Sequence, residues 1–154
     1  MKSLINTAVL AGVCACLTIG AAASAAETEK KVEFLPGDVK YTSNPASPAQ
    51  SAVLYGDPSK EGLYVLRVRI PANTRLPVHT HPDQVRIVSI LSGTLYFGYG
   101  EKFEESKLIA YGPGSFYKEP IGAAHYSWTK EGEVICDVIG VGPSTTNLVK
   151  QAAN

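Results

Sequence analysis

The chain has 154 residues, the length of a single domain, and its 45% hydrophobic and 18% charged residues are typical of a globular protein. Its 14 basic and 14 acidic side chains give a formal net charge of zero at pH 7, and the sequence contains no basic block. Nucleic-acid binding is therefore not expected, because it requires a concentration of positive charge.

The N-terminus, residues 1–25, is predicted to be a secretory signal peptide. An uncharged stretch of apolar and small residues at 4–23 ends in Ala23-Ser24-Ala25, the pattern that a signal peptidase cleaves. Cleavage after Ala25 predicts a periplasmic or secreted protein with no further membrane contact. A retained membrane anchor is an alternative, but a stretch rich in Ala and Gly makes a poor span. Lipoprotein processing at Cys14 or Cys16 is a second alternative.

Removal of residues 1–25 would leave Cys136 as the one cysteine, so no intrachain disulfide could form. We expect Cys136 to be a small buried strand residue. The stability of the domain must then come from its packed core, which a domain of this size can supply.

Three further segments follow the signal peptide. Residues 26–50 are predicted to be an extended lead-in, with one short strand at 32–35 and a loop over 42–48, where Asn, Ser and Pro are frequent. Residues 51–146 are predicted to form the folded barrel, and residues 147–154 a C-terminal tail.

Short alternating or apolar runs, separated by Gly, Pro, Asp and Asn, predict β-strands within the barrel. They lie at residues 63–70, 86–91, 94–99, 108–111, 115–118, 124–129 and 133–141. The runs 86–91 and 94–99 are predicted to pair as a hairpin across Ser92-Gly93, and one helical turn is expected within residues 98–107. Many short strands at regular spacing indicate an all-β sandwich or barrel.

The three histidines of the chain, His79, His81 and His125, fall into one pattern. Side chains two residues apart on a strand point to the same face, so the imidazoles of His79 and His81 can converge on one ion. A turn before His125 would let a closed barrel bring it opposite the pair. A His-x-His pair alone is common on surface strands, but together the three predict a divalent-metal site for iron, zinc, nickel or manganese.

Two segments resemble the two sequence motifs of the cupin superfamily. The first has His79-Thr80-His81, then Arg86 and Gly93, and the second has Gly114, Pro120-Ile121-Gly122, His125 and Thr129, all at the motif spacing. The resemblance covers about residues 60–141, and two motifs in the right order are a specific signal. It implies a cupin double-stranded β-helix, a jelly-roll barrel of six to eight antiparallel strands. It also implies that His79, His81 and His125 are metal ligands.

The sequence departs from the cupin motifs at three positions. Asn73 stands where the first motif opens with Gly, which predicts a left-handed turn position that Asn tolerates. Thr129 replaces a closing Asn. Arg86 replaces the acidic metal ligand and cannot itself bind a cation.

Arg86 leaves three outcomes open for the site. The metal could bind through the three histidines alone, with open positions for water and substrate. Arg86 could instead bind an anionic substrate by a bidentate contact to its carboxylate. The site could also be metal-free, with Arg86 and the histidines forming an anion pocket. Alternatively, a β-bulge would turn Arg86 outward to solvent.

Other polar and aromatic residues near the motifs have simpler expected roles. Asp83 and Gln84 could supply an oxygen ligand but are expected to be solvated loop residues, and Lys118-Glu119 a solvated turn. If His125 faces inward, Ser127 does too. We expect packing roles for the aromatic residues Tyr96, Tyr117, Tyr126 and Trp128.

The functional prediction is an exported cupin-domain protein that binds a divalent metal and serves as a small-molecule metalloenzyme. The site, with three histidines and no acid, resembles thiol and diketone dioxygenases, which use iron. The alternatives are a non-catalytic periplasmic module that binds a small anion or a metal, and a structural dimerisation unit. Expected partners are a small molecule, anionic if Arg86 contacts it, and a second copy of the chain paired through strand edges.

Overall fold

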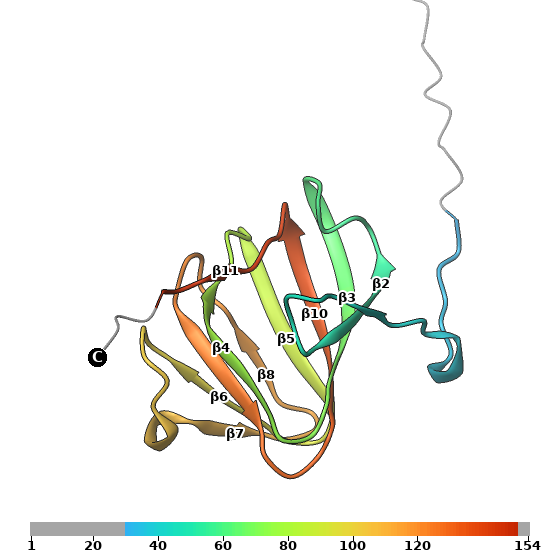
Figure 1. Cartoon of the computed structure of the whole chain (residues 1–154). Helices are drawn as coiled ribbons and strands as arrows, with labels where there is room; N and C mark the ends of the chain where they lie inside the picture. The colour runs from blue at the N-terminus through green and yellow to red at the C-terminus, as the bar shows by residue number, and fades with distance from the viewer. Residues whose placement is uncertain (1–29, 151–154) are drawn as a thin grey trace, which may run out of the picture. The chain divides into compact units, whose positions relative to one another are not determined.

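The computed structural model describes residues 30–150, which form two antiparallel β-sheets that face each other (Figure 1). The first sheet contains, in spatial order, β1 (Thr42–Ser43), β2 (Gln50–Tyr55), β3 (Gly62–Ile70), β10 (Val134–Gly142), β5 (Val85–Ser92) and β8 (Phe116–Lys118). The second contains β11 (Asn147–Leu148), β4 (Thr74–Thr80), β9 (His125–Thr129), β6 (Leu95–Tyr99) and β7 (Ile109–Tyr111). The predicted all-β jelly-roll architecture is confirmed, but residues 30–150 contain eleven strands where six to eight were expected.

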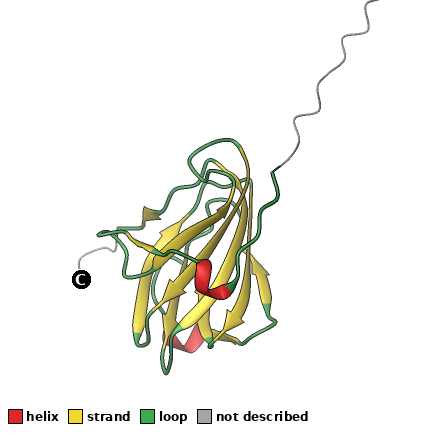
Figure 2. Ribbon diagram, turned by 90° about the vertical axis from the view of Figure 1, so that its right-hand side faces the viewer, coloured by secondary structure: helices red, strands yellow, loops and turns green. Residues whose placement is uncertain are grey.

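All seven predicted strands are present, each within one residue at either end. A short 3-10 helix, η2 (Glu105–Lys107), confirms the helical turn expected within residues 98–107 (Figure 2). The prediction of a strand at 32–35 is wrong, because these exposed residues have no neighbouring strand and lead into a second 3-10 helix, η1 (Pro36–Asp38). Strands β1, β2, β4 and β11 were not predicted as separate elements.

The predicted hairpin across Ser92-Gly93 is also wrong. β5 pairs with β10 and β8, whereas β6 pairs with β7 and β9, so the turn joins one sheet to the other. Gly93 has a φ of +74°, and a Cβ at this position would overlap the backbone carbonyl of Glu133. The turn signal correctly located the ends of both strands, but it could not show that the chain changes sheets.

The hydrophobic core lies between the two sheets. Its aromatic centre is the pair Phe97 and Tyr117, whose ring centroids are 4.2 Å apart. Burying each large apolar side chain contributes about 1.5–3 kcal/mol relative to exposure. The remaining buried members of the cluster are Tyr64, Ile70, Val88, Ile90, Leu95, Val134, Cys136 and Val138.

Two departures from the cupin motifs fix the start of strand β4. Asn73 has a φ of +51°, which confirms the predicted left-handed position. Thr129 is buried, and its hydroxyl donates to the carbonyl of Pro71 at 2.5 Å and accepts from the amide of Thr74 at 3.0 Å. Thr129 therefore ties the end of β9 to the residues on either side of the turn that opens β4.

The C-terminal segment extends the second sheet beside the histidines. Within the predicted tail, Asn147 and Leu148 form β11, which pairs with β4 opposite Thr80 and His79. Among residues 30–150, no helix is long and apolar enough to cross a membrane.

Candidate metal centre

A β-bulge in strand β4 turns two histidines toward the interior. Leu76 pairs with Ser127 and His79 with His125, so β4 has one more residue than β9 between these pairs. Pro77 lies in this bulge, a place where strands accommodate proline. Because side chains alternate with a period of two, the extra residue brings Leu76 and His79 to the same face. Without the bulge, His79 and His81 would point out of the barrel.

The three histidines meet as predicted. His79, His81 and His125 are all buried, and one ligand nitrogen from each lies within 4.8 Å of the other two. The ring centroids of His79 and His125 are 4.3 Å apart, and that of His81 is 5.0 Å and 5.3 Å from these two. Residues 44 positions apart in the chain are thus brought together by the pairing of β4 with β9.

Backbone carbonyls orient all three imidazole rings. Nδ1 of His79 lies 2.6 Å from the carbonyl of Pro77, that of His81 2.8 Å from Thr145, and that of His125 2.8 Å from Ala123. A carbonyl only accepts, so each Nδ1 carries the hydrogen and each Nε2 of the neutral ring presents a lone pair. Metal-binding histidines typically donate the hydrogen of their other ring nitrogen to a carbonyl in this way.

Burial favours the neutral form of the three histidines. It lowers the pKa of His79 and His125 and lowers that of His81 to about 3. Nε2 of His125 is buried and, among the described residues, has no hydrogen-bond partner. Such an orphaned acceptor is costly to bury, and a metal ion would satisfy it.

Arg86 faces the interior, not the solvent. Its Nε donates to Oε2 of Glu119 at 2.6 Å, and its Nη1 donates to the hydroxyl of Tyr64 at 2.8 Å and to that of Ser144 at 3.3 Å. The alternative of a bulge turning this side chain outward is therefore wrong. Whether Arg86 also meets an anionic ligand stays a prediction.

Glu119 lies beside the histidines, a position that was not predicted from the sequence. Its side chain was expected in a solvated turn, but it is only 7% exposed. Its Oε1 lies 3.8 Å from Nε2 of His125, and its Oε2 lies 3.9 Å from Nε2 of His81. Burial raises its pKa, while the guanidinium of Arg86 acts in the opposite direction. The missing signal was alternation, since Glu119 is two residues after the buried Tyr117 and shares its face.

Asp83 is likewise buried, although a solvated loop position was expected. It accepts hydrogen bonds from the hydroxyl of Tyr64 and, at 3.0 Å, from that of Ser144, and its carboxylate is 3.7 Å from Nη1 of Arg86. These contacts occupy both oxygens of Asp83 and make it a support for Arg86. Gln84 is exposed, as expected of a solvated loop residue.

The aromatic residues have the packing roles that were expected. Tyr117 lies in the core, and the ring of Tyr126 packs on Phe103 with centroids 4.8 Å apart. Trp128 lies under the guanidinium of Arg75, 4.1 Å from its ring centroid. Ser127 lines the interior together with His125, as alternation predicted.

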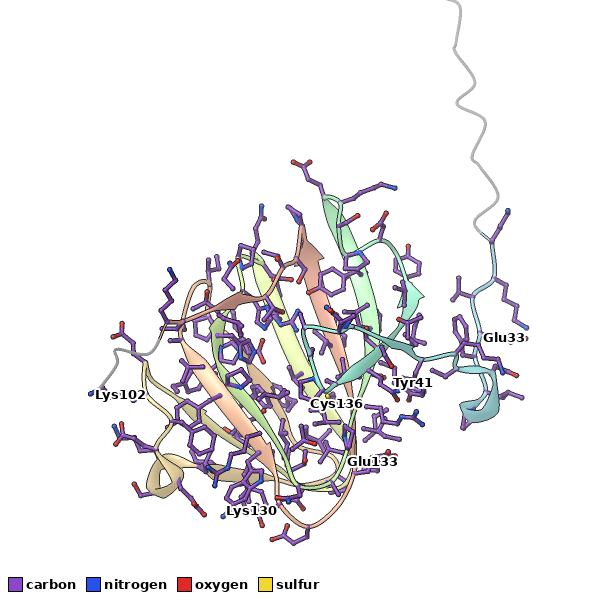
Figure 3. The ribbon with its side chains drawn as sticks, in the orientation of Figure 1. Glu33, Tyr41, Lys102, Lys130, Glu133 and Cys136 are labelled. Carbon is purple, nitrogen blue, oxygen red and sulfur yellow. The ribbon has the colours of Figure 1, made fainter. Side chains whose placement is uncertain are left out.

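A pocket of about 500 Å³ reaches the histidines. Its inner wall includes His79, His81 and Arg86, and its outer wall comes from the lead-in residues 44 and 46–51 and the C-terminal residues 144–146 and 148. A smaller cavity of about 70 Å³ is lined by the three histidines, Arg86 and Glu119 together with core residues such as Cys136, which Figure 3 labels. Segments outside the matched motifs therefore shape the access to the site.

Comparison with known proteins finds similarity in structure only. No protein-family model matches the sequence, and no curated protein is similar to it. The polyketide cyclase RemF from Streptomyces resistomycificus superposes with a TM-score of 0.65 at 16% identity, covering 80% of this chain and 88% of that one. The DMSP lyase DddQ from Ruegeria pomeroyi gives 0.59 at 19% identity, covering 80% and 63%. An RmlC-like cupin from Shewanella frigidimarina gives 0.56 at 10% identity, covering 74% and 93%.

Proposed function

We propose that this protein, which has the cupin fold, binds a divalent metal ion through Nε2 of His79, His81 and His125 and acts on a small molecule held beside that ion. The observation that carries the proposal is the convergence of three buried imidazoles whose Nδ1 atoms are all bonded to backbone carbonyls. Neutral imidazoles that present their Nε2 lone pairs to one another repel unless a cation lies between them.

The buried charges around the histidines also favour a cation. Two carboxyl groups, Glu119 and Asp83, lie against a single guanidinium, that of Arg86. With neutral histidines, ionised carboxylates would leave one negative charge in excess inside the barrel, which is costly in a low dielectric. A divalent ion would change the net charge of these buried groups from minus one to plus one. A bound hydroxide or another monoanionic ligand would then neutralise it.

A metal in this site would supply Lewis-acid polarisation of a bound oxygen or would lower the pKa of bound water. The residues of the chain provide the surroundings. The pocket volume of about 500 Å³ is in the range of small-molecule sites. Apolar side chains from Leu66, Val68 and Leu76 line its wall and would exclude water from the reacting centre.

The carboxylate of Glu119 changes the preferred chemistry. The expectation of dioxygenase-like chemistry depended on a site without an acid, but Glu119 lies 3.8 Å from His125. We therefore favour a non-oxidative reaction on a metal such as zinc. The names of the similar structures, a polyketide cyclase and a DMSP lyase, support this preference at the level of fold alone.

A second candidate is a binding module without turnover, which takes up a small anion or a metal. Arg86 favours it, because its guanidinium lines the same pocket as His79 and His81. The bonds from Arg86 to Glu119 and Tyr64 already compensate much of its charge, so we rank this candidate below the enzyme. We also propose export after cleavage at Ala25 and homodimer formation as the setting of this function.

Cobalt(II) provides a direct test, because its visible spectrum reports its ligands. We expect the wild-type protein to bind cobalt and its spectrum to change when azide, a small anion, takes an open coordination position. The His79→Ala/His81→Ala variant should show neither signal. Wild-type protein without a protein-bound cobalt spectrum would contradict the proposal. Conversion of a panel of small carboxylic acids by the zinc or iron form would support the enzyme, and tight binding without conversion would support the module.

A further inference from the structure

Arg86 and Glu119 face each other across the ladder of β5 and β8. The register pairs Ile87 with Lys118, so the next pair in the antiparallel ladder is Arg86 with Glu119. The amide of Glu119 donates to the carbonyl of Arg86 at 2.9 Å, which extends the ladder by this one pair beyond the end of β8. Directly opposed residues share a face, and this face is the interior that the histidines also occupy.

The two oxygens of the Glu119 carboxylate have different surroundings. Oε2 accepts the hydrogen bond from Nε of Arg86 at 2.6 Å. Oε1 faces Nε2 of His125 at 3.8 Å, and that nitrogen has no hydrogen-bond partner among residues 30–150. With its hydrogen on Nδ1, His125 presents a lone pair to an oxygen that also carries lone pairs. Two acceptors in this position repel each other unless a proton or a metal ion lies between them.

The spacing suits a shared metal ion better than a hydrogen bond. Oε1, the oxygen that Arg86 leaves free, lies 3.8 Å from Nε2 of His125, which exceeds hydrogen-bond length. Two metal–ligand bonds of about 2.0–2.2 Å each, joined at an ion, span distances of this size. Asp83 differs, because its two oxygens are bonded to Tyr64 and Ser144.

We propose that Glu119 is the fourth protein ligand of the metal, held in place by Arg86. The inference rests on the proposed three-histidine site and adds to it a carboxylate from a different strand. In the resemblance to the cupin motif, the acid belongs at position 86 on β5. Here the acid is Glu119, which lies opposite position 86 in the ladder of β5 and β8. Position 86 itself is occupied by the cationic side chain of Arg86. The guanidinium takes one carboxylate oxygen and leaves the other for the ion.

Calorimetric titration of zinc into metal-free protein tests this assignment. We expect Glu119→Gln to weaken zinc binding at least tenfold and Glu119→Ala to weaken it further, with changed cobalt spectra in both variants. The matched control is Asp137→Asn, which removes a partly buried carboxylate that pairs with Arg67 and does not line the pocket, and it should bind zinc within about threefold of wild type. Circular dichroism and thermal unfolding of each metal-free variant show whether it is folded.

The outcomes separate the two proposals. Wild-type protein that binds no zinc or cobalt overturns the three-histidine site itself. Wild-type affinity and an unchanged cobalt spectrum in Glu119→Gln and Glu119→Ala overturn the role of Glu119 while leaving the histidine site intact. Equal weakening in Glu119→Gln and Asp137→Asn would also overturn it, because the effect would then follow the loss of any carboxylate and not ligation.

Discussion

Arg86 and Glu119 form a buried ion pair between neighbouring strands, with Nε of the guanidinium 2.6 Å from the carboxylate. Side-chain exposures of 11% and 7% mean that neither charge is well solvated. β8 is a three-residue strand at the edge of its sheet, so the pair also fastens that edge to β5. One contact therefore contributes both to the position of the carboxylate and to the stability of the barrel.

Breaking this pair from one side should destabilise the metal-free protein. We expect Arg86→Met to lower the free energy of unfolding by about 3–5 kcal/mol, because Glu119 would be left buried without its partner. The double variant Arg86→Met/Glu119→Leu should recover part of that loss, since Glu119 no longer leaves an unpaired charge while Asp83 still lacks its nearby cation. Urea denaturation of the three proteins measures both values, and a double variant less stable than Arg86→Met would contradict this explanation.

Gly140 leaves space for the ring of Tyr64, whose hydroxyl accepts a hydrogen bond from Arg86. A Cβ at this position would overlap the ring and hydroxyl of Tyr64, which bonds both Asp83 and Arg86. We predict that Gly140→Ala costs about 1–3 kcal/mol of stability, as overpacking in a core does. Gly132→Ala is the matched control, because a Cβ at Gly132 meets no atom within 4 Å. Equal unfolding midpoints for the two variants would show that Tyr64 adjusts freely.

The sequence predicted the strands and the three histidines because both depend on local patterns. Alternation and turn residues located seven strands, and the spacing of His79, His81 and His125 matched two motifs. What it missed depends on pairing between strands. The hairpin at Gly93 failed because a turn does not reveal which sheet the next strand joins.

Glu119 illustrates the same limit within the site. Beside Lys118 and before Pro120, it has the local appearance of a solvated turn. Glu119 is buried because it pairs with Arg86, a residue 33 positions away. No local sequence pattern reveals which residue will be its partner. Alternation from Tyr117 was the one local signal that pointed to the correct face.

The stability of the metal-free protein should fall as the pH falls from 7 to 5. An unfolded histidine takes up a proton near pH 6.5, whereas burial lowers the pKa of His79 and His125 and brings that of His81 to about 3. Protonation therefore stabilises the unfolded chain first, by up to ~1.4 kcal/mol per pH unit for each histidine. The loss of stability begins below about pH 6.5. For His81 it continues until the pH reaches the pKa that this residue has in the folded protein.

Glu119 opposes this trend at lower pH, because its raised pKa lets the folded state bind a proton before the unfolded chain does.

Thermal unfolding between pH 7 and 5 would measure the histidine effect. The His79→Ala/His81→Ala variant should show a shallower slope. The same slope in both proteins would mean that other groups control the acid sensitivity.

Export can be checked on the protein purified from a cell that secretes it. We predict that the mature chain begins at Ala26, following cleavage after Ala25, and that Ala23→Arg blocks processing because the peptidase requires small residues there. Intact mass and N-terminal sequencing of the periplasmic or secreted fraction measure this. A mature protein that retains residues 4–23 would contradict the signal-peptide assignment and support a membrane anchor.

Metal content of the mature protein, measured by elemental analysis, is the most direct test of metal binding by the three histidines. The protein would be purified without a His tag or chelator and loaded in turn with iron, zinc, nickel and manganese. We expect about one equivalent of at least one metal in the wild type and loss of that metal in His125→Ala, with the barrel still folded. No bound metal under any loading, or the same content in His125→Ala, would contradict it and would direct the search to small anions bound by Arg86.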